Sequence, residues 1–74
     1  MKTVYIETEF IKLSQLLKYA SIVQNGSDAK FFISEGLVFV DGEVETRRGR
    51  KIYDSMNVKA IVDGKEFNIL VKKR

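Results

Sequence analysis

The chain has 74 residues, the size of one small domain, and its formal net charge is +3. It contains neither cysteine nor histidine, so disulfides, thiolate metal sites and most general-base, triad and zinc chemistry lack their usual side chains. No apolar stretch approaches the roughly 20 residues of a membrane-spanning helix, so we expect no membrane-spanning segment. We expect a single domain over residues 1–74 that binds neither a metal nor a cofactor.

The first third of the chain predicts a strand followed by a helix. Lys2 to Ile6 alternates and is rich in β-forming residues, which is typical of a short strand. Ser14 is the predicted N-cap of the helix, although Thr8 followed by Glu9 could start it earlier. The apolar face of this helix follows the i, i+3, i+4, i+7 spacing and consists of Leu13, Leu16, Leu17 and Ala20.

A second, shorter helix is expected after Asn25-Gly26, which is predicted as a turn. Ser27 is its predicted N-cap, and Asp28 is placed favourably against the helix dipole. Gly36 stands where a C-terminal cap needs a positive φ. The predicted apolar face consists of Ala29, Phe32, Ile33 and Leu37.

Two hairpins follow, because Asp41-Gly42 and Asp63-Gly64 each lie between alternating residues and Asp-Gly there is the strongest short hairpin signal. Val38 and Val40 lead into the first turn, and Val44 lies on the returning strand. The second hairpin pairs residues 57–62 with residues 66–71, and its candidate inward positions are Val58, Ile61, Phe67, Ile69 and Val71. The order of elements predicts an α+β fold with two short helices packed on a small antiparallel sheet.

A compact basic loop lies between the hairpins: residues 47–51 read Arg-Arg-Gly-Arg-Lys, with no acid among them. Such a run repels itself unless an anion lies opposite, and backbone phosphate is the commonest such anion. Gly49 lets the backbone approach a ligand closely, and arginine forks suit phosphate. We therefore predict binding by Arg47, Arg48, Arg50 and Lys51; a merely solvated loop is the alternative.

Further candidates lie near the predicted helix N-termini, whose N–H groups bind anions. They are Lys12 and Lys30, with Ser27 as a cap first and a phosphate contact second. We expect Lys18 to be solvated. Phe31, Phe39 and Tyr53 are candidates for stacking on an unpaired base, whereas the core is expected to take Tyr5, Phe10 and Phe67.

Three segments together carry a family resemblance: Lys12-Leu-Ser-Gln-Leu-Leu17, Ser27-Asp-Ala-Lys30, and Ile33 through Gly42. They resemble the pattern of the RNA-binding domain named after ribosomal small-subunit protein four, the S-four domain, which is built on the alpha-L motif. The similarity is closest to small free-standing members of the YaaA type, which carry Glu-Thr-Arg-Arg-Gly-Arg-Lys at the position of residues 45–51. It covers about residues 9–62.

The chain departs from the family pattern at several positions. Ser14 replaces an aspartate, Asp41 an asparagine, and Ser55-Met56 a Gly-Asp pair. Asp28 stands where many members have an arginine, which weakens the inherited role of that helix as a phosphate clamp. Lys30, about one turn along, could partly replace that arginine.

The resemblance implies a module that recognises structured RNA, either ribosomal RNA or an assembling ribosomal subunit, through the basic loop and the helix N-termini. Contacts would go to phosphates and 2′-hydroxyls, because A-form RNA hides its base edges in a deep groove. Ribosomal subunit proteins are possible further partners, and we expect a cytoplasmic monomer. A protein-interaction module that docks an acidic partner surface is the alternative. A small hydrolase is remote, because so short a chain can hardly enclose a pocket of about 300 Å³.

Overall fold

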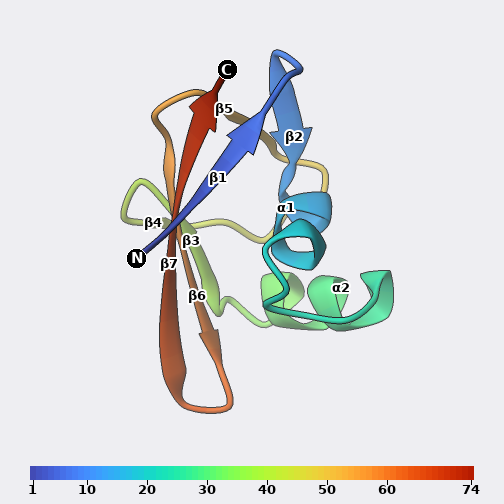
Figure 1. Ribbon diagram of the computed structural model, residues 1–74. Coiled ribbons are helices and arrows are strands. Elements are labelled where there is room, and N and C mark those ends of the chain that lie inside the picture. Colours follow the sequence, from blue (N-terminus) through green and yellow to red (C-terminus); the bar gives the residue numbers. More distant parts are fainter.

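The computed structural model describes the whole chain, from Met1 to Arg74, and it has an α+β fold (Figure 1). The predicted first strand, both helices and both hairpins are confirmed. In chain order the elements are β1 (Lys2–Ile6), β2 (Phe10–Lys12), α1 (Leu13–Tyr19), α2 (Gly26–Ser34), β3 (Val38–Val40), β4 (Glu43–Val44), β5 (Lys51–Tyr53), β6 (Asn57–Val62) and β7 (Lys65–Lys73).

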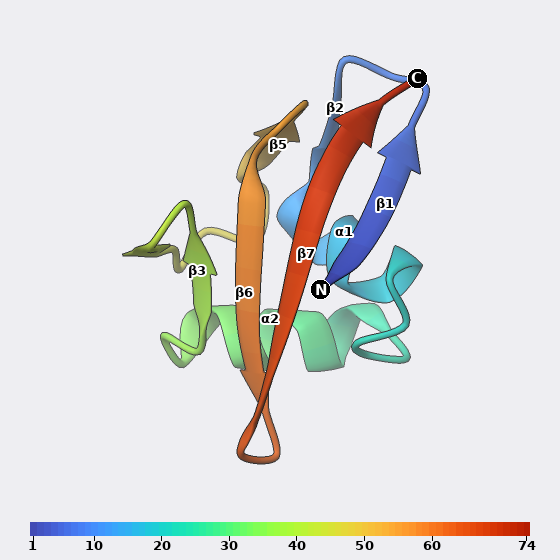
Figure 2. The same ribbon diagram turned by 60° about the vertical axis from the view of Figure 1, so that its left-hand side comes forward.

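The main sheet has the strand order β1-β7-β6-β3-β4. The pairs β3–β4, β3–β6 and β6–β7 are antiparallel, as expected of consecutive hairpins. β1 adds a parallel edge strand, with Lys2 opposite Ile69 and Ile6 opposite Lys73. A parallel pair requires a long crossover, and here the crossover includes both helices, so the first and last strands lie side by side (Figure 2).

Both Asp-Gly hairpin turns are confirmed by their backbone angles. Asp41 and Gly42 have φ values of 49° and 86°, and Asp63 and Gly64 have φ values of 52° and 77°. Positive φ at both central positions is the signature of a type I′ turn, whose twist matches that of the flanking strands. Gly36, with φ of 78°, ends the α2 region as predicted.

The core lies between one face of the main sheet and the two helices, which cover that face together (Figures 1 and 2). The predicted apolar face of α1 is confirmed, since all four of its residues are buried. From α2, Ala29 and Ile33 are fully buried, while Phe32 packs against the edge of the core. Neither helix is long and apolar enough to cross a membrane. The buried sheet residues are Val4, Ile6, Val38, Val40, Val58, Ala60, Ile69 and Val71.

Both predicted N-caps are wrong. α1 begins at Leu13, one residue before Ser14, and its capping residue makes no side-chain hydrogen bond. α2 begins at Gly26, and its cap is Asn25, whose side chain accepts from the Asp28 amide at 2.9 Å. Asn25-Gly26 is therefore the start of a helix rather than a separate turn. Asparagine and serine cap helices about equally well, so the sequence left the choice of cap open.

Four assignments to the core are also corrected. Phe10 is only half-buried and is not among the residues that pack against the core. Ile61 is only half-buried, because Val58 and Ala60 occupy the inner face of β6 and strand side chains alternate. Tyr5 is 50% exposed, and Phe67, near the turn of the β6–β7 hairpin, is 37% exposed.

A small second sheet was not predicted. β2 pairs antiparallel with β5, and this pair also rules out a helix start at Thr8. The register places Phe10 opposite Tyr53 and Lys12 opposite Lys51. The central pair, Ile11 and Ile52, packs into the core, with Ile52 fully buried. Since strand side chains alternate, the two aromatic and two lysine side chains share the opposite, outer face.

Candidate nucleic-acid interface

The basic loop, residues 47–51, is fastened to the start of α1 by its backbone. The amides of Leu13 and Ser14 donate to the carbonyls of Arg50 and Arg48, at 2.8 Å and 3.1 Å. The first N–H groups of a helix have no intrahelical acceptor, so the loop takes the place of a side-chain cap. These two amides are consequently occupied, and the expected anion site at this helix N-terminus loses them.

Glu45 holds the basic loop from the other side. Its side chain is only 7% exposed and accepts from Arg47 Nε at 2.9 Å and from Arg50 Nη1 at 2.7 Å. Arg47 also donates through Nη2 and through its own amide, both at 3.0 Å. The hydrogen bonds from the Arg47 side chain outweigh the effect of burial and lower the pKa of Glu45 to about 2. The anion that this basic run requires is thus supplied in part by the chain itself.

Sequence reasoning missed Glu45. The available signal was an acid directly before the run, with arginines two and five residues later. Neither spacing corresponds to a regular helical or strand pairing, so only the folded loop reveals the contact.

Four cations that make no ion pair surround an open groove of about 670 Å³. They come from four separate segments: Lys12 at the end of β2, Lys18 in α1, Lys30 in α2, and Arg48 in the basic loop. The groove has no acidic and no hydrophobic residue in its lining, which is completed by Ser14, Gln15, Gly26, Ser27 and Gly49. The structure therefore brings together four of the predicted site residues, and Lys18 joins them although it was expected to be merely solvated.

The remaining predicted residues lie on the other side of the basic loop. Arg47, Arg50 and Lys51 line a separate hollow of about 460 Å³ with Gly49 and Tyr53. Only Gly49 borders both hollows, and an added Cβ there would meet nothing within 4 Å, so a ligand can approach the backbone closely. The basic loop thus serves two adjoining surfaces, and two of its arginines are already bound to Glu45.

The N-terminus of α2 borders the groove with Gly26 and Ser27. The next two amides, of Asp28 and Ala29, are satisfied by the side chain and the carbonyl of Asn25. Ser27 thus faces the groove from the first turn of the helix rather than as its cap.

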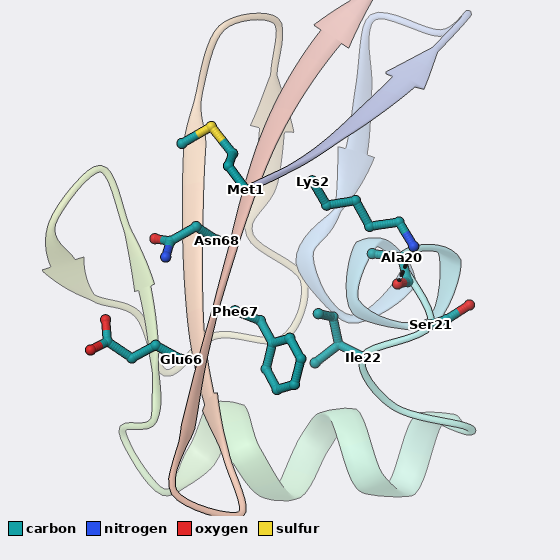
Figure 3. Close-up of a pocket in the computed structure, with 8 residues that line it drawn as sticks. All are labelled: Met1, Lys2, Ala20, Ser21, Ile22, Glu66, Phe67 and Asn68. Carbon is teal, nitrogen blue, oxygen red and sulfur yellow. Dashed lines mark hydrogen bonds between the residues drawn. The ribbon is translucent and has the colours of Figure 1, made fainter.

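A third hollow, of about 470 Å³, does not suit a polyanion (Figure 3). The Phe67 ring points toward Ile22, and Glu66 adds a negative charge to the lining. Its one cationic side chain, Lys2, donates to the Ala20 carbonyl at 2.9 Å and so lies across the hollow rather than facing a ligand.

The aromatic side chains predicted to escape the core fare differently. Phe31 is 55% exposed and Tyr53 is 45% exposed, as expected. Phe39 is half-buried, with the Lys59 ammonium 4.6 Å from its ring centre. Nowhere do three histidine, cysteine, aspartate or glutamate side chains cluster so that they could hold a metal ion.

Comparison with known proteins gives consistent matches. A family model described as an S4 domain matches residues 4–70. RlbA of Bacillus subtilis (strain 168), whose name gives it a probable role in ribosome maturation, is 52% identical over 48 residues, covering 65% of this chain and 68% of that protein. YbcJ of Escherichia coli (strain K12), named as a candidate RNA-binding protein, is 44% identical over 48 residues, covering 65% of this chain and 69% of that protein. The matches agree with the resemblance drawn from the motifs.

Proposed function

The chain belongs to the S4 domain family, and we propose that it recognises structured RNA through the groove. We further propose that the target is ribosomal RNA in an assembling subunit. One observation carries the proposal. Four cations without ion pairs surround a groove whose lining contains no acid. Unpaired cations held together repel one another, and phosphate is the ligand that relieves this repulsion.

The anchoring of the groove supports recognition by shape. Lys18 and Lys30 project from helices, and Arg48 lies on a loop fixed by two backbone hydrogen bonds to α1 and by the nearby Glu45 pairs. A cradle with fixed spacing favours one backbone geometry over others. Duplex RNA offers a regular array of phosphates and 2′-hydroxyls, whereas its base edges are hidden in the deep groove.

The choice of ribosomal RNA rests on a relative. The name of RlbA refers to ribosome maturation, and that protein shares 52% identity with this chain over the matched segment. The groove by itself supports an RNA duplex without identifying which one.

Competition binding tests the groove with three probes: an RNA hairpin, an unpaired scramble of the same length, and the matching DNA hairpin. We expect the RNA hairpin to bind best. Arg48→Ala and Lys30→Ala should weaken hairpin binding, whereas Lys65→Ala, which removes the same charge from the start of β7, should not. Equal affinity for all three probes would reduce the interaction to unspecific electrostatic attraction. Absence of RNA binding at low salt would favour an acidic protein partner instead.

Crosslinking in cells followed by sequencing of the attached RNA tests the target. We expect ribosomal RNA fragments with duplex segments to be enriched, and the enrichment to fall for Arg48→Ala but not for Lys65→Ala. Enrichment of messenger or transfer RNA alone would refute the ribosomal target while leaving the groove in place.

A further inference from the structure

The outer face of the β2–β5 pair carries an unusual set of side chains. Phe10 lies opposite Tyr53, and Lys12 lies opposite Lys51, so a pair of aromatic rings lies beside a pair of ammonium groups on one small surface. The ring centres of Phe10 and Tyr53 are 5.8 Å apart, and the Lys51 ammonium lies 4.9 Å from the centre of the Phe10 ring. We call these four residues the aromatic platform.

The composition of the aromatic platform is unfavourable for the free protein. Like charges directly opposite each other on neighbouring strands destabilise a sheet, and Lys12 and Lys51 form such a pair. Tyr53 is 45% exposed, although a tyrosine can bury a large apolar area. The Phe10–Tyr53 and Lys51–Phe10 contacts offset part of this cost, but two like charges beside an exposed ring are typical of a binding surface.

The aromatic platform is continuous with the proposed duplex site. Lys12 belongs to the platform and also lines the groove. Gly49 borders both the groove and the hollow that contains Lys51 and Tyr53. An RNA strand that leaves the groove past Gly49 therefore reaches Tyr53 without leaving the basic surface.

We propose that the aromatic platform binds an unpaired nucleotide that directly adjoins the RNA duplex in the groove, with its base stacked on Tyr53. The proposal rests on the proposed function, because it extends the same RNA across the basic loop. Lys51 and Tyr53 flank the buried Ile52 in β5, so their side chains lie on the same face. In this arrangement Lys51 can contact the phosphate of that nucleotide.

Aromatic and cationic groups together identify the ligand. An aromatic side chain stacks on the face of a base, and that face is accessible only when the base is outside a duplex. The adjacent lysines require a negative charge at the same place, which the nucleotide phosphate supplies and a neutral apolar peptide does not.

The test uses one RNA hairpin in three forms: blunt-ended, extended by two unpaired nucleotides, and extended by two abasic nucleotides. Each extension is made on the 3′ end and, separately, on the 5′ end. We expect one polarity of the base-containing extension to bind at least about fivefold more tightly than the blunt hairpin, since stacking contributes ~1–3 kcal/mol per base. The abasic extension adds the same phosphates without bases, so it should recover only a minor part of this gain.

Variants then assign the stacking to Tyr53. Tyr53→Leu should abolish the preference for the extended hairpin and leave blunt-hairpin affinity within about twofold, whereas Tyr53→Phe should keep the preference. Tyr19→Leu, at the end of α1 and 67% exposed, is the matched control and should change neither. A 2-aminopurine in the extension should lose fluorescence on binding to the Tyr53→Phe variant and the original chain alike, which provides a readout even if Tyr53→Leu fails to fold.

The outcomes separate the two proposals. Blunt-hairpin binding without a preference for the extended forms would overturn the platform and leave the groove in place. A preference that persists in Tyr53→Leu would also overturn it, because the base would then stack elsewhere. Failure of every RNA form to bind would refute the proposed function itself.

Discussion

Glu45→Gln is expected to destabilise the domain strongly for a single-atom change. The glutamine amide keeps the size of the side chain but loses the charge and one of the two acceptor oxygens. Glu45 accepts four hydrogen bonds, three from Arg47 and one from Arg50, and its side chain is only 7% exposed. The replacement therefore leaves an arginine donor facing an amide N–H group in a buried setting.

The magnitude follows from the pKa of Glu45, which the hydrogen bonds from Arg47 lower from 4.5 to about 2. At about 1.4 kcal/mol per pKa unit, the ionised carboxylate would contribute at most about 3.5 kcal/mol to the free energy of unfolding at neutral pH. Arg47 is 73% exposed, so solvent screens its part of the interaction, and we expect about 2 kcal/mol. That is a large share of the stability of so small a domain.

The contribution must also depend on pH, and its sign is fixed. Glu45 has a lower pKa in the folded chain than in the unfolded chain, so its contribution is complete above pH 4.5 and is lost as the pH falls through about 2. Urea unfolding of the original chain and of Glu45→Gln, at pH 7, 4 and 3, should show a difference that is largest at pH 7 and less than half as large at pH 3. Taking the difference cancels other acidic groups such as Asp54, whose pKa is lowered by its hydrogen bond from the Lys73 amide.

A difference in stability that stays constant from pH 7 to pH 3 would refute the reasoning, because it would show that lost packing rather than lost charge causes the effect. A difference below about 0.5 kcal/mol at pH 7 would show that the pairs with Arg47 and Arg50 are no stronger than ordinary surface ion pairs.

Three further predictions separate folding from binding. Val40→Ala should lower the free energy of unfolding by about 1–3 kcal/mol through lost burial and a cavity. Arg48→Ala should change the free energy of unfolding by no more than about 0.5 kcal/mol while weakening RNA binding. If Arg48→Ala unfolds the domain, the role of the basic loop is structural. Gly36→Ala should cost about 1 kcal/mol in urea unfolding because its φ is 78° with nothing within 4 Å of an added Cβ, so an unchanged midpoint would contradict the strain argument. With four unpaired cations at the groove, the log–log slope of RNA affinity against salt should be about −3 to −4, and a slope near zero would exclude phosphate contacts.

The parts of the fold that the sequence predicts are those governed by local chemistry. The two Asp-Gly turns require positive φ at consecutive residues, which few other residue pairs adopt, so both hairpins could be located without a structure. The apolar spacing of α1 likewise predicts which residues meet the core, whatever the core contains.

The parts that the sequence does not predict depend on distant partners. β1 alternates like any half-buried strand, but nothing in its residues shows that it lies parallel to β7, more than sixty residues away. β2 and β5 are three residues long, which is too short for a periodic signal. The caps failed for a related reason: the amides of Leu13 and Ser14 are satisfied by carbonyls of the basic loop, which has no capping side chain to recognise.

The site was predicted more by charge than by geometry. Lys12, Lys30 and Arg48 do converge on one groove, and Lys18, which was expected to be solvated, also lines it. Arg47 was predicted as a free phosphate ligand, whereas much of its hydrogen-bonding capacity is used by Glu45.

The ion pairs of Glu45 with Arg47 and Arg50 lead to different expectations for RNA binding under two views of the basic loop. If the loop acts only through its charge, Glu45→Gln removes one negative charge and should tighten binding to every nucleic acid. If the loop acts through fixed positions, the same change releases Arg47 and Arg50, raises the ordering cost of binding, and should narrow the preference for an RNA hairpin over a DNA hairpin. Glu45 fixes the positions of two arginines through buried ion pairs, and the backbone of the loop is hydrogen-bonded to α1. The structure therefore favours the second view. Measured with the same pair of hairpins, an RNA-to-DNA preference that is unchanged in Glu45→Gln while both affinities rise would establish the first.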